Sequence, residues 1–180
     1  MEKINFTELL YSVVIGMSFL KINLSMPFTS ILMFSFAILV IFDDWIEYHY
    51  YIRIFLHEKK LNGNRKKLIL MIIDFLFLAV WYLIIIIPYS NFQYYLLLFS
   101  ILFFLGVVWT LISEGIKKNI RHLFTETDIP IMIYFIIVFL IYSMFDLFSL
   151  RIPIIIVSII FFVIIRIPIW SDISSQEFDI

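Results

Sequence analysis

The sequence contains no cysteine and only three histidines and four glycines among its 180 residues. Without cysteine it can form no disulfide, no thiolate metal site and no thiol nucleophile, and three histidines leave little for a zinc centre. The few glycines form no dinucleotide-binding or phosphate-binding loop. We therefore expect neither a cofactor nor a bound metal.

Charged residues are scarce as well, at 15% of the chain, and their formal net charge is -1. This balance gives no indication of nucleic-acid binding. Hydrophobic residues make up 63% of the chain and the mean hydropathy is +1.06. A soluble domain of this size needs far more polar surface, so the expected surroundings are a lipid bilayer.

The apolar residues fall in six blocks, each close to the ~20 residues that a bilayer-spanning helix requires. These blocks are residues 6–22, 28–52, 68–88, 92–115, 129–148 and 152–170. Their continuous apolar runs lack the alternation of a membrane barrel, so helices are expected. The prolines Pro88, Pro130, Pro153 and Pro168 lie at or near block ends. We predict an all-α, polytopic membrane helix bundle of about six transmembrane helices, forming a single domain over residues 1–180.

Two connections between the blocks are basic, one from Arg53 to Lys67 and one from Lys117 to His122. Because cytoplasmic loops retain Lys and Arg while translocated loops lose them, both are expected in the cytoplasm. An even number of spans then places both termini there, in a multi-pass protein of the cell inner (plasma) membrane. The first block must cross for this alternation to hold, and it lacks the basic start and cleavage site of a signal peptide.

Polar residues inside the second block are informative, because a charge at mid-bilayer costs ~3 kcal/mol or more and tends to face protein or water. Trp45, His49 and Arg53 are spaced by four residues and share one helix face. They can therefore form one polar stripe. The alternative, an interfacial belt of Trp and Tyr with snorkelling charges, explains Tyr50, Tyr51 and Arg53. It explains Asp43 and Asp44 poorly, since both lie deeper in the block.

Three more charged residues lie in other blocks. Glu8 is interpreted either as a carboxylate stabilised by the helix dipole near the headgroups or as a buried anchor of the first helix. Asp74 is expected to be paired or protonated, with His49 or the Trp45 indole as its structural partner; a proton or cation relay is the alternative. Arg166 is interpreted as a snorkelling residue near the inner end of the last block.

Motifs in the first two blocks add a further indication. Phe6-Thr7-Glu8 precedes the run "LLYSVVIGMSFL", and the second block carries Ser35-Phe36, then Trp45 and Tyr48-His49. The order resembles the bacterial branch of the lysosomal-type potassium channel family, the transmembrane protein 175 family, which opens its first helix with Phe-Ser-Asp. That family places an arginine ahead of the motif, where this chain has only Lys3.

The resemblance implies a homotetrameric channel for monovalent cations, with K⁺ as the expected ion and the first helix of each subunit lining a central pore. Its hydrophobic constriction would be formed by Val13, Gly16 and Leu20, which share one helix face. Apolar rings of this kind gate by dewetting. Gly16 offers no hydroxyl to a dehydrated ion, so weak selectivity is expected. The implied polar network comprises Phe6, Thr7, Glu8, Trp45, His49 and Asp74.

The composition and the embedded charges also fit other functions. A non-channel integral membrane component, or an effector of a bacterial defence or stress system, would also suit a small protein with a basic cytoplasmic face. A small proton-coupled transporter would use Asp43, Asp44 or Asp74, although helix breaks at mid-membrane are not evident. An enzyme is not expected, because no residues combine a nucleophile, a base and an oxyanion donor.

Overall fold

The computed structural model describes residues 12–17, 27–58, 64–86, 91–114, 129–145 and 147–177. All regular structure in these ranges is helical, which confirms the predicted all-α class for the described residues. The elements are α2 (Phe28–Glu58), α3 (Asn64–Ile86), α4 (Phe92–Glu114), α6 (Ile129–Met144), the 3-10 turn η1 (Phe148–Leu150) and α7 (Arg151–Glu177). A short helical turn over 12–17 precedes them.

Four helices are long and apolar enough to cross a membrane. Their apolar stretches are Phe28–Ile46, Leu68–Ile86, Phe92–Ile112 and Arg151–Ser171, and they coincide with four of the predicted blocks. The apolar α6 has 16 residues, about 24 Å of helix against a hydrocarbon core of about 30 Å. Of the first predicted block, only 12–17 is described. The chain is membrane-embedded and helical, while a total of six spans stays a prediction.

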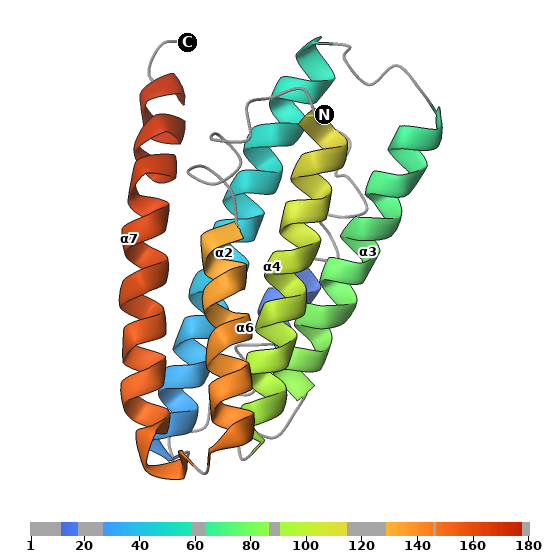
Figure 1. Ribbon diagram of the computed structural model, residues 1–180. Coiled ribbons are helices and arrows are strands. Elements are labelled where there is room, and N and C mark those ends of the chain that lie inside the picture. The colour runs from blue at the N-terminus through green and yellow to red at the C-terminus, as the bar shows by residue number, and fades with distance from the viewer. Residues whose placement is uncertain are drawn as a thin grey trace.

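Successive long helices run in opposite directions. The C-terminal ends of α2, α4 and α7 therefore lie at the same end of the bundle as the N-terminal end of α3 (Figure 1). The first basic connection, Arg53 to Lys67, starts within the last turns of α2 and ends in the first turn of α3, and the second starts three residues after α4. The cytoplasmic location of these connections stays a prediction. The antiparallel order of the helices agrees with the alternation of basic and non-basic connections on which that prediction is based.

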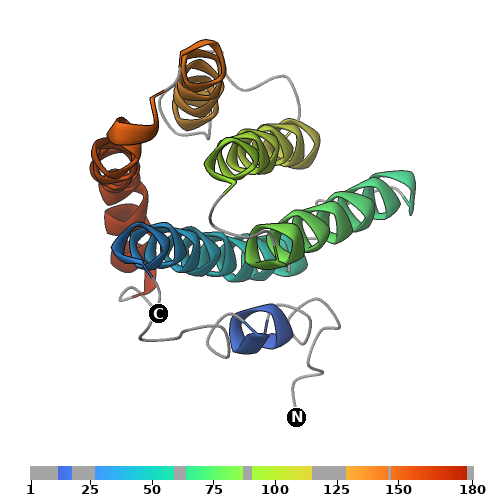
Figure 2. The same ribbon diagram turned by 90° about the horizontal axis from the view of Figure 1, so that it is seen from below.

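The helices α2, α3, α4, α6 and α7 pack in that order into a closed ring, which is seen along its axis in Figure 2. The most extensive contacts join α4 to α6 and to α3, and α7 closes the ring by packing against both α2 and α6. Every one of these helices is apolar around most of its circumference, as expected for helices in lipid. The fit of side chains between neighbouring helices, and not amphipathicity, therefore decides which face of each helix turns toward the interior of the ring.

Aromatic side chains fill the interior of the ring. Phe99 of α4 is fully buried at the centre, with its ring centroid 4.9 Å from that of Phe36 in α2 and 5.3 Å from that of Phe135 in α6. Trp81 of α3 meets Phe99 edge-on at 6.2 Å, and Phe162 of α7 meets Phe36 edge-on at 5.7 Å. Each of the five helices thus contributes an aromatic side chain to one core.

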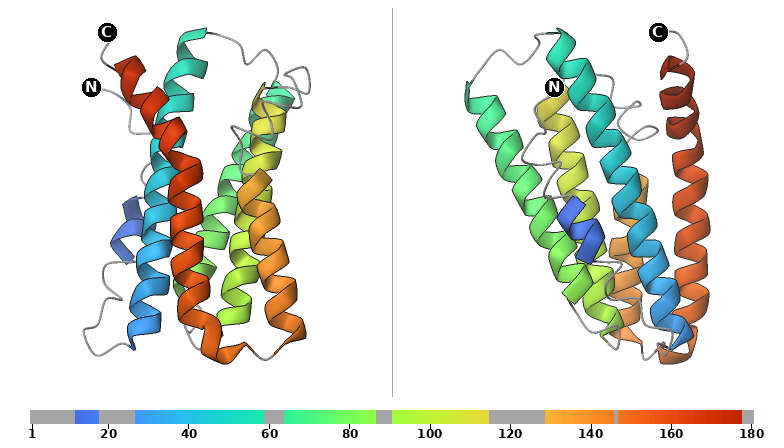
Figure 3. Two further views of the ribbon diagram at one scale, coloured as in Figure 1. Left: turned by 60° about the vertical axis from the view of Figure 1, so that its left-hand side comes forward. Right: turned by 180° about the vertical axis from the view of Figure 1, so that it is seen from behind.

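The helical turn over 12–17 lies outside this ring, alongside α2 and α3 (Figures 2 and 3). Val14 is buried and belongs to the hydrophobic core cluster, whereas Val13, Gly16 and Met17 are exposed. The turn therefore has an inner face that contacts the ring and an outer face that the ring leaves uncovered.

The proline at position 168 departs from the sequence-based expectation. It was predicted near the end of a block, but α7 continues through Pro168 to Glu177. Proline has no backbone N–H, so the carbonyl of Ile164 lacks its usual helical donor. Membrane helices tolerate such an interior proline. The residues two positions before and after it, Arg166 and Trp170, both turn toward α2.

Candidate functional site

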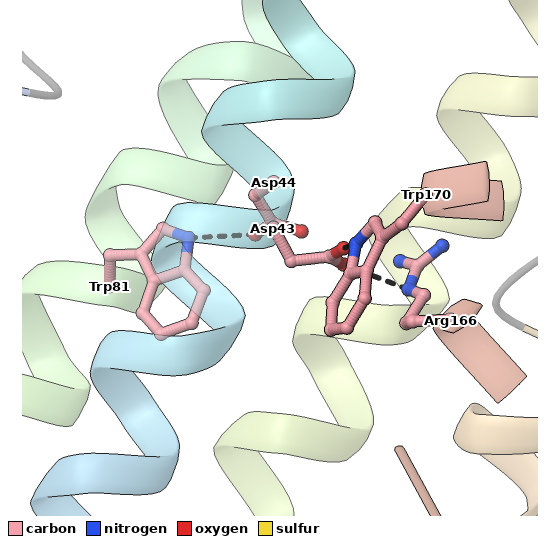
Figure 4. A network of polar contacts seen from close by, with 5 residues as sticks. All are labelled: Asp43, Asp44, Trp81, Arg166 and Trp170. Carbon is pink, nitrogen blue, oxygen red and sulfur yellow. Dashed lines mark hydrogen bonds and ion pairs between the residues drawn. The ribbon is translucent and has the colours of Figure 1, made fainter. Parts of the chain in front are cut away.

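The most polar part of the described interior is built around Asp43 of α2. This side chain is 1% exposed, and its Oδ2 lies 2.8 Å from Nε of Arg166 in an ion pair. The indole N–H of Trp170 donates to Oδ1 of the same carboxylate at 2.7 Å. Figure 4 shows both groups reaching Asp43 from α7. Because Arg166 and Trp170 are four residues apart, one face of α7 supplies the cation and the neutral donor together.

Arg166 is as deeply buried as its partner, at 1% exposed. Its guanidinium carbon also lies 5.6 Å from the ring centroid of Phe162, one turn earlier on α7. The interpretation of Arg166 as a snorkelling residue is therefore wrong. The buried carboxylate of Asp43 offsets the cost of holding a guanidinium away from water, which removes the need to reach the headgroups.

Asp44, the next residue on α2, faces a different neighbour. The indole N–H of Trp81 in α3 donates to its Oδ2 at 3.0 Å (Figure 4). Consecutive helical residues point about 100° apart. Asp43 and Asp44 consequently tie α2 to α7 on one side and to α3 on the other.

Asp74 of α3 forms a third pair of the same kind. The indole N–H of Trp109 in α4 donates to its Oδ1 at 3.1 Å. Three of the four tryptophans thus donate to an aspartate on another helix. Indole suits this role because it presents one N–H donor on a large apolar body, so it satisfies a carboxylate without bringing further polar atoms into the membrane.

Weaker polar ties join other helix pairs of the ring. The buried hydroxyl of Tyr95 in α4 donates to the backbone carbonyl of Met33 in α2 at 2.7 Å. The hydroxyls of Tyr134 and Ser158 lie 3.0 Å apart between α6 and α7. All five helices are therefore linked by side-chain hydrogen bonds or ion pairs as well as by packing.

The structure describes only part of the polar network predicted from the sequence. Phe6, Thr7, Glu8 and Leu20 lie outside the described residues, as does the side chain of His49. Trp45 is half-buried and packs against the hydrophobic core. The indole that reaches Asp74 belongs to Trp109 and not to Trp45, while the alternative partner, His49, stays a prediction.

Sequence reasoning missed three participants, Trp81, Trp109 and Trp170, and gave Arg166 a different role. A signal for them exists, since the described apolar spans hold three aspartates that need donors and several indoles on other helices that need acceptors. Among the described residues, no group of three His, Cys, Asp or Glu side chains could hold a metal ion. The arrangement pairs one buried carboxylate with a cation, gives two others an indole donor, and links neighbouring helices through these contacts.

Comparisons of the chain with protein-family models, with curated proteins and with solved structures give no match in any of the three. The resemblance to the lysosomal-type potassium channel family is therefore carried only by the motifs in the first two blocks.

The contribution of one such tie is measurable. Trp81→Phe keeps a buried aromatic ring but leaves Asp44 without the indole donor. We expect the free energy of unfolding in detergent to fall by about 2 kcal/mol, in the range for hydrogen bonds to charged groups. Tyr82→Phe, at an exposed position one residue further along α3, should change it by less than about 0.5 kcal/mol. Equal effects of the two substitutions would contradict a stabilising role for the Trp81 indole.

Proposed function

We propose that the protein is an oligomeric channel for monovalent cations, with K⁺ as the expected ion, whose pore lies between subunits. The observation that carries the proposal is the placement of the turn over 12–17. Val14 faces the ring, while Val13 and Gly16, two of the three expected constriction residues, face outward. A pore-lining face has to be left uncovered by its own subunit, and this face is.

The packed interior of the ring supports a pore between subunits over one inside a single chain. Its centre is occupied by Phe36, Phe99 and Phe135, whose ring centroids lie within 5.8 Å of one another. An ion path needs either water or polar groups that replace the hydration shell. Packed aromatic side chains provide neither, so we place the conducting surface outside the ring of helices.

Gly16 fits the same proposal. A methyl group added there would meet nothing within 4 Å, so packing inside the subunit does not require glycine. In a homotetramer the four copies of Val13 and Gly16 would form successive levels of an apolar constriction that gates by dewetting. We further propose the cell inner (plasma) membrane as its location, with both termini cytoplasmic, from the distribution of basic residues.

Ion flux through the purified protein in liposomes tests this function. Val13→Asn places a polar amide at the proposed constriction and should raise K⁺ flux several-fold, because a hydrated ring resists dewetting. The matched control is Val157→Asn on α7, which makes the same replacement at a site of similar exposure, 52% against 49% for Val13. It should leave flux per folded protein unchanged.

Two results would reject the channel. One is the absence of cation flux from wild-type protein that is folded and inserted in the liposomes. The other is a monomeric mass in detergent and in native membranes, because a single subunit cannot surround a pore with one exposed turn. Equal flux changes in Val13→Asn and Val157→Asn would reject Val13 as a constriction residue.

A further inference from the structure

Asp74 differs from Asp43 by its surroundings. It is the only charged residue of the apolar stretch Leu68–Ile86. It lies six residues past the start of that stretch, roughly 9 Å along the helix axis. Its side chain is half-buried and turned toward α4, where it meets Trp109.

The groups around Asp74 include no described cation. On α4, the described side chains from Phe92 to Ile112 carry no charge. On α2, the charged residues with described side chains are Asp43 and Asp44, which bond to α7 and to Trp81. The hydrogen bond that Asp74 does accept comes from a neutral indole. Asp43, by contrast, has the guanidinium of Arg166 beside it.

This difference in partners sets the charge of the two groups. An ionised carboxylate in an apolar medium is costly unless a cation balances it, and an uncompensated one is neutralised by taking up a proton. A single neutral hydrogen bond offsets only part of that cost. Indole is a donor only, so Trp109 can bond an oxygen of Asp74 whether the carboxyl is protonated or ionised. The geometry of the α3–α4 pair accommodates both states.

We propose that Asp74 is a proton-binding site in the α3–α4 interface. The carboxyl holds a proton at neutral pH and releases it to water as the pH rises, which leaves a negative charge between two apolar helices. Asp43, in contrast, has the guanidinium of Arg166 to balance its charge. The proposal requires the helices to be embedded in a membrane, and it is independent of whether the protein conducts ions.

Infrared spectroscopy of protein reconstituted in lipid vesicles tests the site, because a protonated carboxyl has a carbonyl band that a carboxylate lacks. At neutral pH the wild type should show this band in the difference spectrum against Asp74→Asn. Raising the pH should abolish it. Asp74→Asn keeps an acceptor for Trp109 and reproduces the uncharged state, so it is expected to fold. Asp43→Asn, made at the ion-paired carboxylate, should leave the band in place.

Trp109→Phe gives an independent readout that retains the carboxyl. Loss of the indole donor should shift the band to higher frequency, since a carbonyl relieved of a hydrogen bond has a stiffer bond. The matched control Trp81→Phe removes the donor of Asp44 and should cause no shift. The proposal is overturned if Asp74→Asn leaves the neutral-pH spectrum unchanged, or if the band is insensitive to Trp109→Phe. Ion flux has no part in the outcome, so failure of the channel proposal would be seen separately.

Discussion

Replacing Arg166 by methionine is expected to lower the free energy of unfolding by about 3–5 kcal/mol, because it breaks a buried ion pair. Methionine fills much of the same space but leaves the buried carboxylate of Asp43 without a cation. The indole of Trp170, 2.7 Å from Asp43, cannot compensate for a full charge. Denaturant titration in detergent micelles measures the change.

A second substitution separates the missing charge from lost packing. In Asp43→Asn with Arg166→Met, both charges are absent and the amide oxygen still accepts from Trp170. Replacing a whole buried ion pair by neutral groups is often nearly neutral for stability, so the double variant should recover most of the loss. Arg151→Met is the control, because Arg151 is half-exposed and donates to the hydroxyl of Tyr142 at 2.7 Å. It should cost about 1 kcal/mol. A double variant as unstable as Arg166→Met would mean that packing, not charge, dominates.

Phe99→Ala should also be strongly destabilising, by about 3–5 kcal/mol, because it opens a cavity where the helices of the ring meet. Phe99 is 0% exposed and contacts aromatic rings from α2, α3 and α6 as well as its own helix. In lipid the loss is one of van der Waals packing, since exposed apolar surface carries little penalty there.

Phe104→Ala is the matched control for this substitution. It removes the same side chain five residues along α4, from a position that is 54% exposed. Its expected effect is within about 0.5 kcal/mol, as for other surface positions. Thermal unfolding of the two variants in one detergent makes the comparison. Similar losses from both would indicate that intrinsic helix stability, and not the aromatic core, limits the fold.

The helices could be predicted from the sequence because bilayer thickness fixes the length of an apolar block. The predicted block 92–115 corresponds to the helix Phe92–Glu114, and the predicted block 68–88 corresponds to the helix Asn64–Ile86. The ends were less accurate where a helix extends beyond the apolar region, as α7 does past Pro168 to Glu177. Proline ends helices in water more often than it ends membrane helices, where neighbouring helices and local adjustments satisfy the freed backbone groups.

The partners of the embedded charges could not be predicted to the same degree. The positions of Asp43, Asp44 and Asp74 inside apolar blocks indicate that their charges are costly in lipid. These positions carry no information on which helix lies beside each residue. Phe99 and Phe104 are equally hydrophobic, yet one is central and the other faces outward. Without a polar face on each helix, the rotation of α4 or α7 depends on tertiary packing. The roles of Trp109 and Arg166 follow from that rotation.

The link between Asp43 and α7 also has a consequence for biosynthesis. Asp43 and Trp170 are separated by 127 positions in the chain, and Arg166 is nearly as distant from Asp43. During translation α2 emerges long before α7, so the nascent chain carries Asp43 through the insertion of α3, α4 and α6 with its cation still unsynthesised. Until then the translocon, water or a bound proton has to accommodate this carboxylate. The charge of Asp43 in α2 is therefore balanced only after α7 has emerged.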